Sequence, residues 1–184
     1  EIINKYDKDN MIEVIKKLYF HIEHSFEIIS ESNLNKRNNI KNILICGMGG
    51  SAIGGDFVKT VLKDDLNIPI FVNRDYDLPN WISPDTLVII CSYSGNTEET
   101  ISCYNNIVIN NISPIVISSG GYLLQDAKEN QFDFVQLPSG IQPRAAFGYS
   151  ASLLLLALVE IGIIDKKYSD QLFNSIDSIK SKRS

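Results

Sequence analysis

The sequence predicts a doubly wound α/β domain, in which one sheet of about five parallel strands carries helices on both faces. Three observations predict this fold. Short apolar runs alternate along the chain with helical patterns. The runs are continuous and rich in Ile and Val, which is typical of strands buried on both faces. Two of the runs end in loops of glycine and hydroxyl residues that open a helix, and ligands of such sheets bind at the carboxyl ends of the strands.

The first expected element is an amphipathic helix over Asn10–Glu31, because apolar residues recur there at helical spacing. His21 and His24 lie beside the apolar stripe, three residues apart. We expect them on a solvent-exposed face, because a metal site would need more ligands than the two histidines supply. The polar stretch Asn33–Asn39 separates this helix from the first strand.

The rest of the chain alternates strands with helices. Their apolar runs predict strands at Asn42–Cys46, Pro69–Asn73, Thr86–Cys91, Pro114–Ser118 and Phe132–Leu137. Helical patterns predict helices at Ala52–Lys63, Thr97–Ile109, Leu123–Asn130, Pro143–Ile161 and Lys166–Lys182.

The most apolar segment, Leu153–Ile164, is too short to span a bilayer and is interrupted by Glu160 and Gly162. We therefore expect no membrane partner. This segment and the leading helix instead suggest a buried interface, either with a second domain or with another subunit, most simply in a homodimer.

The composition excludes nucleic acid as a partner. The chain of 184 residues has 17 basic and 22 acidic side chains, a formal net charge of −5, so no basic face is available to neutralise a phosphate backbone. Its three cysteines fit no metal or disulfide spacing, and we expect buried structural thiols in a reducing cytoplasm.

The ends of the sequence suggest a piece of a longer protein. The first residue is Glu1 rather than methionine, and the last residues form a lysine-rich helical segment without a capping signal. We therefore expect one domain over residues 1–184, as the first half of a two-domain chain.

A glycine loop follows the first strand. Glycine amides and a helix N-terminus at such a place bind phosphate. Gly47–Ala52 also satisfies the dinucleotide fingerprint G-x-G-x-x-G/A, which is weak evidence alone. An NAD(P)-binding oxidoreductase would want an acidic residue at the end of the second strand, where Asn73 and Arg74 stand and Asp75 is only close. A third interpretation is a turn that serves helix–strand packing.

A second loop, Ser92–Thr97, decides between these interpretations. It follows another apolar strand, offers three hydroxyls and a turn-forming Gly95, and opens a helix. A phosphate monoester has three oxygens that suit such a nest, whereas a dinucleotide needs no second loop. The plainer alternative is that Ser and Thr only cap the helix, for which one hydroxyl would suffice.

Three segments together resemble the sugar-isomerase (SIS) domain: GMGGSAIGG (Gly47–Gly55), SYSGNTEET (Ser92–Thr100) and PSGIQPRAAFGYS (Pro138–Ser150). More narrowly, they look like the N-terminal half of bifunctional phosphoglucose/phosphomannose isomerases. The second motif is shared by SIS domains generally, whereas the first and third are more specific to the isomerase branch. The resemblance implies a flavodoxin-like sandwich and a phosphorylated hexose as substrate, with no cofactor and no metal.

The resemblance also implies roles for single residues. In the family, the sugar phosphate is held by residues equivalent to Gly49, Gly50, Ser51, Ser92, Ser94 and Thr97. Arg144 corresponds to an arginine that stabilises negative charge on an enediol intermediate. Because Pro143 is a good first helical residue, we expect Arg144 at a helix N-terminus facing the pocket. Without the resemblance, a surface arginine in an ion pair would be an equal interpretation.

The general base has no visible counterpart in this sequence. The family takes its base glutamate and its ring-opening histidine from a second SIS domain or a partner subunit, and Glu98 and Glu99 are better explained as favourable charges in the first turn of a helix. The sequence therefore predicts the phosphate-binding half of a hexose-phosphate isomerase. A non-catalytic phosphosugar-binding regulatory module and an NAD(P)-dependent oxidoreductase remain as alternatives.

Overall fold

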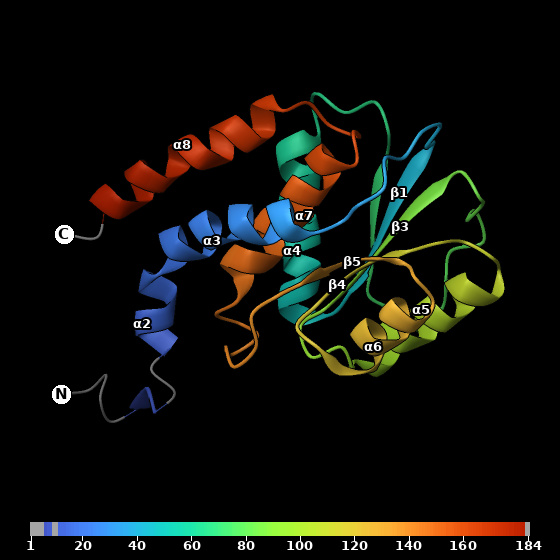
Figure 1. Cartoon of the computed structure of the whole chain (residues 1–184), viewed down its shortest axis with the longest axis horizontal. Helices are drawn as coiled ribbons and strands as arrows, with labels where there is room; N and C mark the ends of the chain where they lie inside the picture. Colours follow the sequence, from blue (N-terminus) through green and yellow to red (C-terminus); the bar gives the residue numbers. More distant parts are fainter. Residues whose placement is uncertain (1–5, 9–10, 183–184) are drawn as a thin grey trace.

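A computed structural model describes residues 6–8 and 11–182 of the chain. The structure contains the five-stranded parallel sheet that the sequence predicts (Figure 1), and its strand order is β2-β1-β3-β4-β5. The strands are β1 (Asn42–Gly47), β2 (Ile70–Asn73), β3 (Thr86–Ser92), β4 (Ile115–Ser118) and β5 (Asp133–Gln136). The helices are α2 (Met11–Lys16), α3 (Leu18–Glu31), α4 (Gly49–Leu62), α5 (Glu98–Ile109), α6 (Gly121–Glu129), α7 (Phe147–Glu160) and α8 (Lys167–Ser181).

Helices cover both faces of the sheet, so the domain has three layers (Figure 1). α3, α4 and α7 lie on one face, and α8 packs over α3 and α7. α5 and α6 cover the other face. Successive side chains of a strand point to opposite faces of the sheet. In β1, Ile43 and Ile45 belong to the first core, beneath α4 and α7, while Leu44 and Cys46 belong to the second core, beneath α5 and α6.

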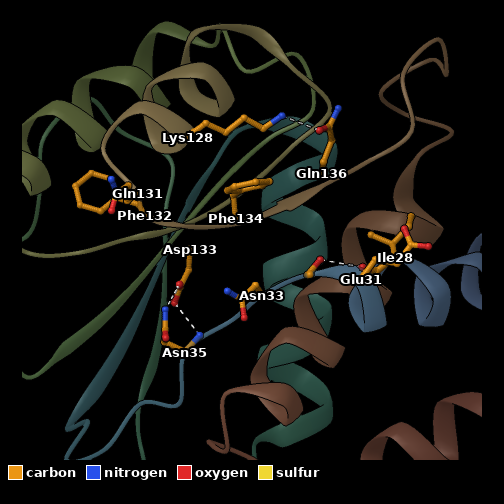
Figure 2. Close-up of a pocket in the computed structure, with 11 residues that line it drawn as sticks. Ile28, Glu31, Asn33, Asn35, Lys128, Gln131, Phe132, Asp133, Phe134 and Gln136 are labelled. Atoms are coloured by element: carbon orange, nitrogen blue, oxygen red, sulfur yellow. Dashed lines mark hydrogen bonds between the residues drawn. The ribbon is translucent and has the colours of Figure 1, made fainter.

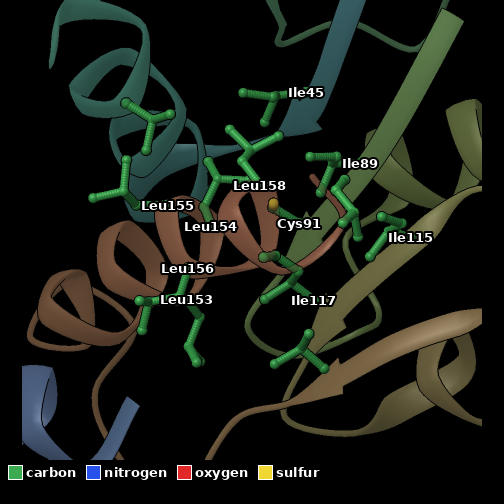
Figure 3. Packing of buried hydrophobic residues seen from close by; sticks show 14 of the residues in the cluster. Ile45, Ile89, Cys91, Ile115, Ile117, Leu153, Leu154, Leu155, Leu156 and Leu158 are labelled. Atoms are coloured by element: carbon green, nitrogen blue, oxygen red, sulfur yellow. The ribbon is translucent and has the colours of Figure 1, made fainter. Parts of the chain in front are cut away.

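α7 is the central helix of the first core. All of its residues from Ala151 to Leu158 are buried, and they pack against Ile45, Ile89 and other branched side chains of the sheet (Figure 3). A helix that is apolar on every side is explained by burial on every side. The interface that we expected from Leu153–Ile164 is therefore not supported by this segment, because the chain itself covers its leucines.

The leading helix differs from the expectation in two respects. Its described part is two helices, because the amide of Lys17 bonds three residues back to Val14 (3.0 Å) and interrupts the regular ladder. The predicted first residue, Asn10, lies outside the described residues. His21 is buried rather than solvated, with its ring stacked on Tyr149 of α7 at 4.5 Å between centroids. The expectation of an exposed face was wrong for His21, since α3 packs against both α7 and α8.

Two helix boundaries also differ from the prediction. α4 starts at Gly49, three residues earlier than expected, since Gly49 adopts a positive φ of 51° that leads directly from the strand into the helix. α7 starts at Phe147, four residues later than expected, because the amides of Ala145 and Ala146 bond the carbonyl of Gln142 in a tight turn. No helix within residues 6–8 and 11–182 is long and apolar enough to cross a membrane.

Candidate functional site

The two glycine-hydroxyl loops lie side by side at the carboxyl edge of the sheet. β1 and β3 are neighbours, and the last residue of β1, Gly47, pairs with Cys91 of β3. After β1 the chain passes to α4 on one face, and after β3 it passes to α5 on the other. This is the point of an open α/β sheet where a crevice forms between diverging connections and where ligands bind.

The first loop brings the backbone of β1 close to its neighbour. A Cβ at Gly47 would lie 2.9 Å from the Cys91 carbonyl oxygen, so this approach needs glycine. Gly49 and Gly50 open α4, where amides have no carbonyl four residues back to bond. The hydroxyl of Ser51 makes no hydrogen bond within the described part of the chain. Two amides and one hydroxyl are thus available to an anion.

The second loop is organised by hydrogen bonds between its own hydroxyls. The Ser92 and Thr97 hydroxyls lie 2.9 Å apart, and Ser92 also accepts from the Gly95 amide at 3.1 Å. Ser94 accepts from the Asn96 amide at 3.2 Å and remains exposed. Thr97 precedes α5 yet makes no side-chain cap bond to it. The capping interpretation therefore fails for Thr97, and the first amides of α5 stay uncapped.

The turn between β4 and α6 supports this second loop, although none of the motifs found in the sequence includes it. A Cβ at Gly95, which has a φ of 68°, would lie only 1.8 Å from the Gly120 carbonyl oxygen. The amide of Leu123 donates to the Gly95 carbonyl at 3.1 Å, and the amide of Tyr122 donates to the Asn96 side chain at 2.9 Å. The pair Gly120–Gly121, at the end of a short strand, was the available clue.

The third motif reaches the same place. A Cβ at Gly50 would lie 3.0 Å from the Pro143 carbonyl oxygen, so the turn over residues 143–146 rests on the first loop. Arg144 lies in this turn, three residues before the first residue of α7, Phe147. The expectation that Arg144 lies at the N-terminus of the helix was therefore wrong. Its side chain is exposed and makes no hydrogen bond or ion pair with the described residues. The ion-paired surface arginine is thus not what the structure contains.

A small pocket joins the three motifs. It is lined by residues of each of them, together with residues at the ends of three strands: Gly50, Ser51, Cys91, Tyr93, Ile117, Leu137, Pro143, Ala146 and Ser150. None of these lining residues is a carboxylate or a histidine. Burial raises the pKa of the Cys91 thiol to about 12, so this sulfur stays protonated at neutral pH and is no nucleophile.

Charges around the pocket are few. Glu98 and Glu99 occupy the first turn of α5, as expected of acidic residues at the positive end of a helix. Glu98 lies 3.5 Å from the Tyr76 hydroxyl. Arg74, at the end of β2, is paired with Asp56 of α4. The residues that the structure describes contain no cluster of three or more metal-ligating side chains.

The end of β2 bears on the dinucleotide alternative. Asn73 occupies it and donates to the carbonyls of Asp75 and Asp77, at 3.3 and 3.0 Å. A ribose-binding carboxylate would have to stand at this position. The amide side chain there is committed to the local turn, which speaks against a dinucleotide.

A larger hollow lies elsewhere, along the outer edge of β5 (Figure 2). It has a volume of about 510 Å³ and runs from Asn35 and Asp133 to Lys128 and Gln136. The Asp133 carboxylate is buried and already bonded to Asn35 (2.6 Å) and Arg37 (2.9 Å). Its charge is therefore satisfied, and none of the three motifs reaches this hollow.

Comparisons with known proteins agree with the resemblance to the SIS domain. Residues 36–132 match the family model of the SIS domain. The chain is 40% identical over 174 residues to a bifunctional phosphoglucose/phosphomannose isomerase of Caldicellulosiruptor bescii, covering 94% of this chain and 51% of that protein. It is 40% identical over 145 residues to the protein of the same name from Aquifex aeolicus, covering 77% and 45%.

Among solved structures, the C-terminal domain of a glucosamine-fructose-6-phosphate aminotransferase from Francisella tularensis superposes with a TM-score of 0.65 at 18% identity. The match covers 94% of this chain and 54% of that one, and at this identity it speaks for the fold alone. The chain spans about half the length of the curated relatives that it matches.

Proposed function

This chain belongs to the SIS domain family, and on that premise we propose that it forms the phosphate-binding half of a hexose-phosphate isomerase. The reaction is the interconversion of glucose 6-phosphate, mannose 6-phosphate or both with fructose 6-phosphate. The observation that carries the proposal is the convergence of three separate motifs, from β1, β3 and the segment before α7, on one pocket at the carboxyl edge.

The phosphate group is held where the two loops meet. The amides of Gly49 and Gly50 and the first turn of α5 direct partial positive charge at one point. The hydroxyls of Ser51, Ser94 and Thr97 add donors to the phosphate oxygens. Ser92 contributes by fixing Thr97 and the Gly95 amide, since its own hydroxyl is buried and bonded within the loop.

Arg144 acts on the reacting end of the sugar. Removal of a proton next to the carbonyl places negative charge on O1 and O2 of an enediol, and a nearby guanidinium stabilises that charge mainly in the transition state. The exposed, unpaired Arg144 side chain is available for this contact. Pro143 and Ala146, on either side of it, line the pocket.

The general base comes from outside the pocket described above, because no lining residue there carries a carboxylate or an imidazole. We assign it to a second SIS domain or a partner subunit. Residues 1–184 alone are then expected to bind sugar phosphate weakly and to give no turnover. Isomerase activity from this segment alone would contradict the assignment.

Arg144→Ala in the full-length protein tests the central role. We expect kcat to fall by about 10²- to 10³-fold, the usual loss when one charge-stabilising donor is removed. Arg74→Ala is the matched control, since Arg74 is another arginine at the carboxyl edge but is paired with Asp56. A wild-type rate in Arg144→Ala would overturn the role of this residue.

Ligand titrations separate the alternatives. Fructose 6-phosphate is expected to bind and NADH is not, whereas an oxidoreductase domain would show the reverse. Sugar-phosphate binding without any turnover in the full-length protein would favour a regulatory phosphosugar-binding module.

A further inference from the structure

The hydroxyl of Tyr93 connects the second motif (Ser92–Thr100) to the third (Pro138–Ser150), which lie far apart in the sequence. Tyr93 lies in the second loop, between Ser92 and Ser94. Its hydroxyl donates to the Pro138 carbonyl at 2.9 Å and accepts from the Ile141 amide at 2.8 Å. One oxygen atom thus holds both ends of the four-residue turn that leads toward Arg144.

The backbone of Tyr93 is itself firmly held. Its carbonyl accepts from both the amide (3.1 Å) and the hydroxyl (2.6 Å) of Ser119, in the turn after β4. Burial raises the pKa of the Tyr93 phenol, so the hydroxyl keeps its proton and can donate to Pro138. The backbone of Tyr93 is therefore held in place, and its hydroxyl carries the proton that the bond to Pro138 requires.

The turn that Tyr93 holds leads into the turn that contains Arg144. Gly140 has a φ of 82°, which reverses the chain, and three residues after Ile141 stands Arg144. The other side of the Arg144 turn is fixed by the start of α7 and by close packing of Pro143 on Gly50. The Tyr93 hydroxyl ties residues 138–141 to the second loop.

We propose that Tyr93 is a positioning residue. It holds Arg144 over the pocket, at a fixed position relative to the phosphate group that the second loop binds. This inference rests on the function proposed above. It implies that the tyrosine acts through the arginine and touches no reacting atom. Its loss should lower turnover while leaving phosphate affinity almost unchanged.

Tyr93→Phe in the full-length protein removes only the bridging oxygen. We expect kcat for fructose 6-phosphate to fall about tenfold, with KM within about twofold, because the donors of Ser51, Ser94 and Thr97 remain. Tyr168→Phe is the matched control: its hydroxyl makes a bond of 2.6 Å to Asp65, which follows α4 at the opposite edge of the sheet. The control should keep the wild-type kcat.

A double-mutant cycle shows whether Tyr93 acts through Arg144. In an Arg144→Ala background, Tyr93→Phe should lower the residual kcat no further, since the group that it positions is gone. Equal tenfold losses in both backgrounds would overturn the proposal, as would a rise in KM at unchanged kcat.

Hydrogen–deuterium exchange supplies a readout that does not need activity. In Tyr93→Phe the amides of residues 138–146 should exchange faster, because Ile141 has lost its acceptor, while residues 118–123 stay as in the wild type. Unchanged exchange in 138–146 would overturn the coupling. A wild-type protein that does not isomerise sugar phosphates would refute the proposed function instead, and exchange would still decide whether Tyr93 holds the turn.

Discussion

Gly95 is the position where one added methyl group should disturb the second loop most strongly. A Cβ there would lie 1.8 Å from the Gly120 carbonyl oxygen, 2.7 Å from the carbon of the same carbonyl, and 2.8 Å from the Ser118 hydroxyl. Real Cβ atoms essentially never approach within 3.0 Å, so the β4–α6 turn would have to move by more than about 1 Å. Backbone on both sides of the contact leaves no flexible side chain to give way.

The cost of Gly95→Ala can be assembled from these contacts. An alanine held at a φ of 68° costs about 1 kcal/mol. Displacing the turn breaks two backbone bonds, from Ser119 to Tyr93 and from Leu123 to Gly95, each worth about 1 kcal/mol net. We therefore expect a loss of about 3 kcal/mol in the free energy of unfolding.

Gly162→Ala provides the matched comparison. Gly162 has a similar φ of 83° at the end of α7, but a Cβ there would meet only the Lys36 side chain, at 3.6 Å. This variant should lose about 1 kcal/mol, the cost of the backbone conformation alone. Urea unfolding followed by far-UV circular dichroism measures both. Equal losses in the two variants would refute the steric argument, and with it the rigid support of the second loop.

Two further predictions concern buried titratable groups. Burial, with Lys17 and His24 nearby, lowers the pKa of His21 below its ordinary 6.5, so the unfolded chain takes up the proton at a higher pH than the folded one and the free energy of unfolding should fall as pH drops below about 6.5. His21→Gln should make this pH dependence less steep. Urea titrations at several pH values measure it, and an unaltered slope in the variant would contradict the assignment. The Cys91 thiol has a pKa of about 12 and is 4% exposed, so iodoacetamide at pH 8 should leave it unmodified in the native protein and alkylate it in urea. Peptide mass spectrometry measures the modification. Rapid labelling of Cys91 in the native protein would disprove this prediction.

The sheet could be predicted from the sequence because its strands carry their own signal. Continuous branched runs such as Leu87–Cys91 have no polar face, so burial on both sides and hence parallel pairing follow. The position of the two loops at one edge then follows from topology alone. The expected burial of Cys46 and Cys91 is likewise confirmed, and Cys103 of α5 is also free and buried.

Features that depend on contacts between distant segments could not be predicted. His21 is buried because two other helices pack around α3, which the spacing of a single helix does not reveal. The turn at Arg144 arises from bonds to the Gln142 carbonyl, whereas the sequence showed only a proline suited to a helix start. The bridge from Tyr93 to residues 138–141 joins positions more than forty residues apart in the chain. The roles assigned to the site residues stay predictions until the variants above are measured.

The burial of α7 from Ala151 to Leu158 has a consequence for how this protein can be made. Residues 147–160 come late in the chain, yet they close the face of the sheet that β1 and β3 form some sixty to a hundred residues earlier. While the chain is being synthesised, the isoleucines on this face of β1 and β3 are thus exposed to solvent until α7 has left the ribosome. Fragments that stop before α7 should accordingly aggregate or engage chaperones rather than form a smaller stable unit.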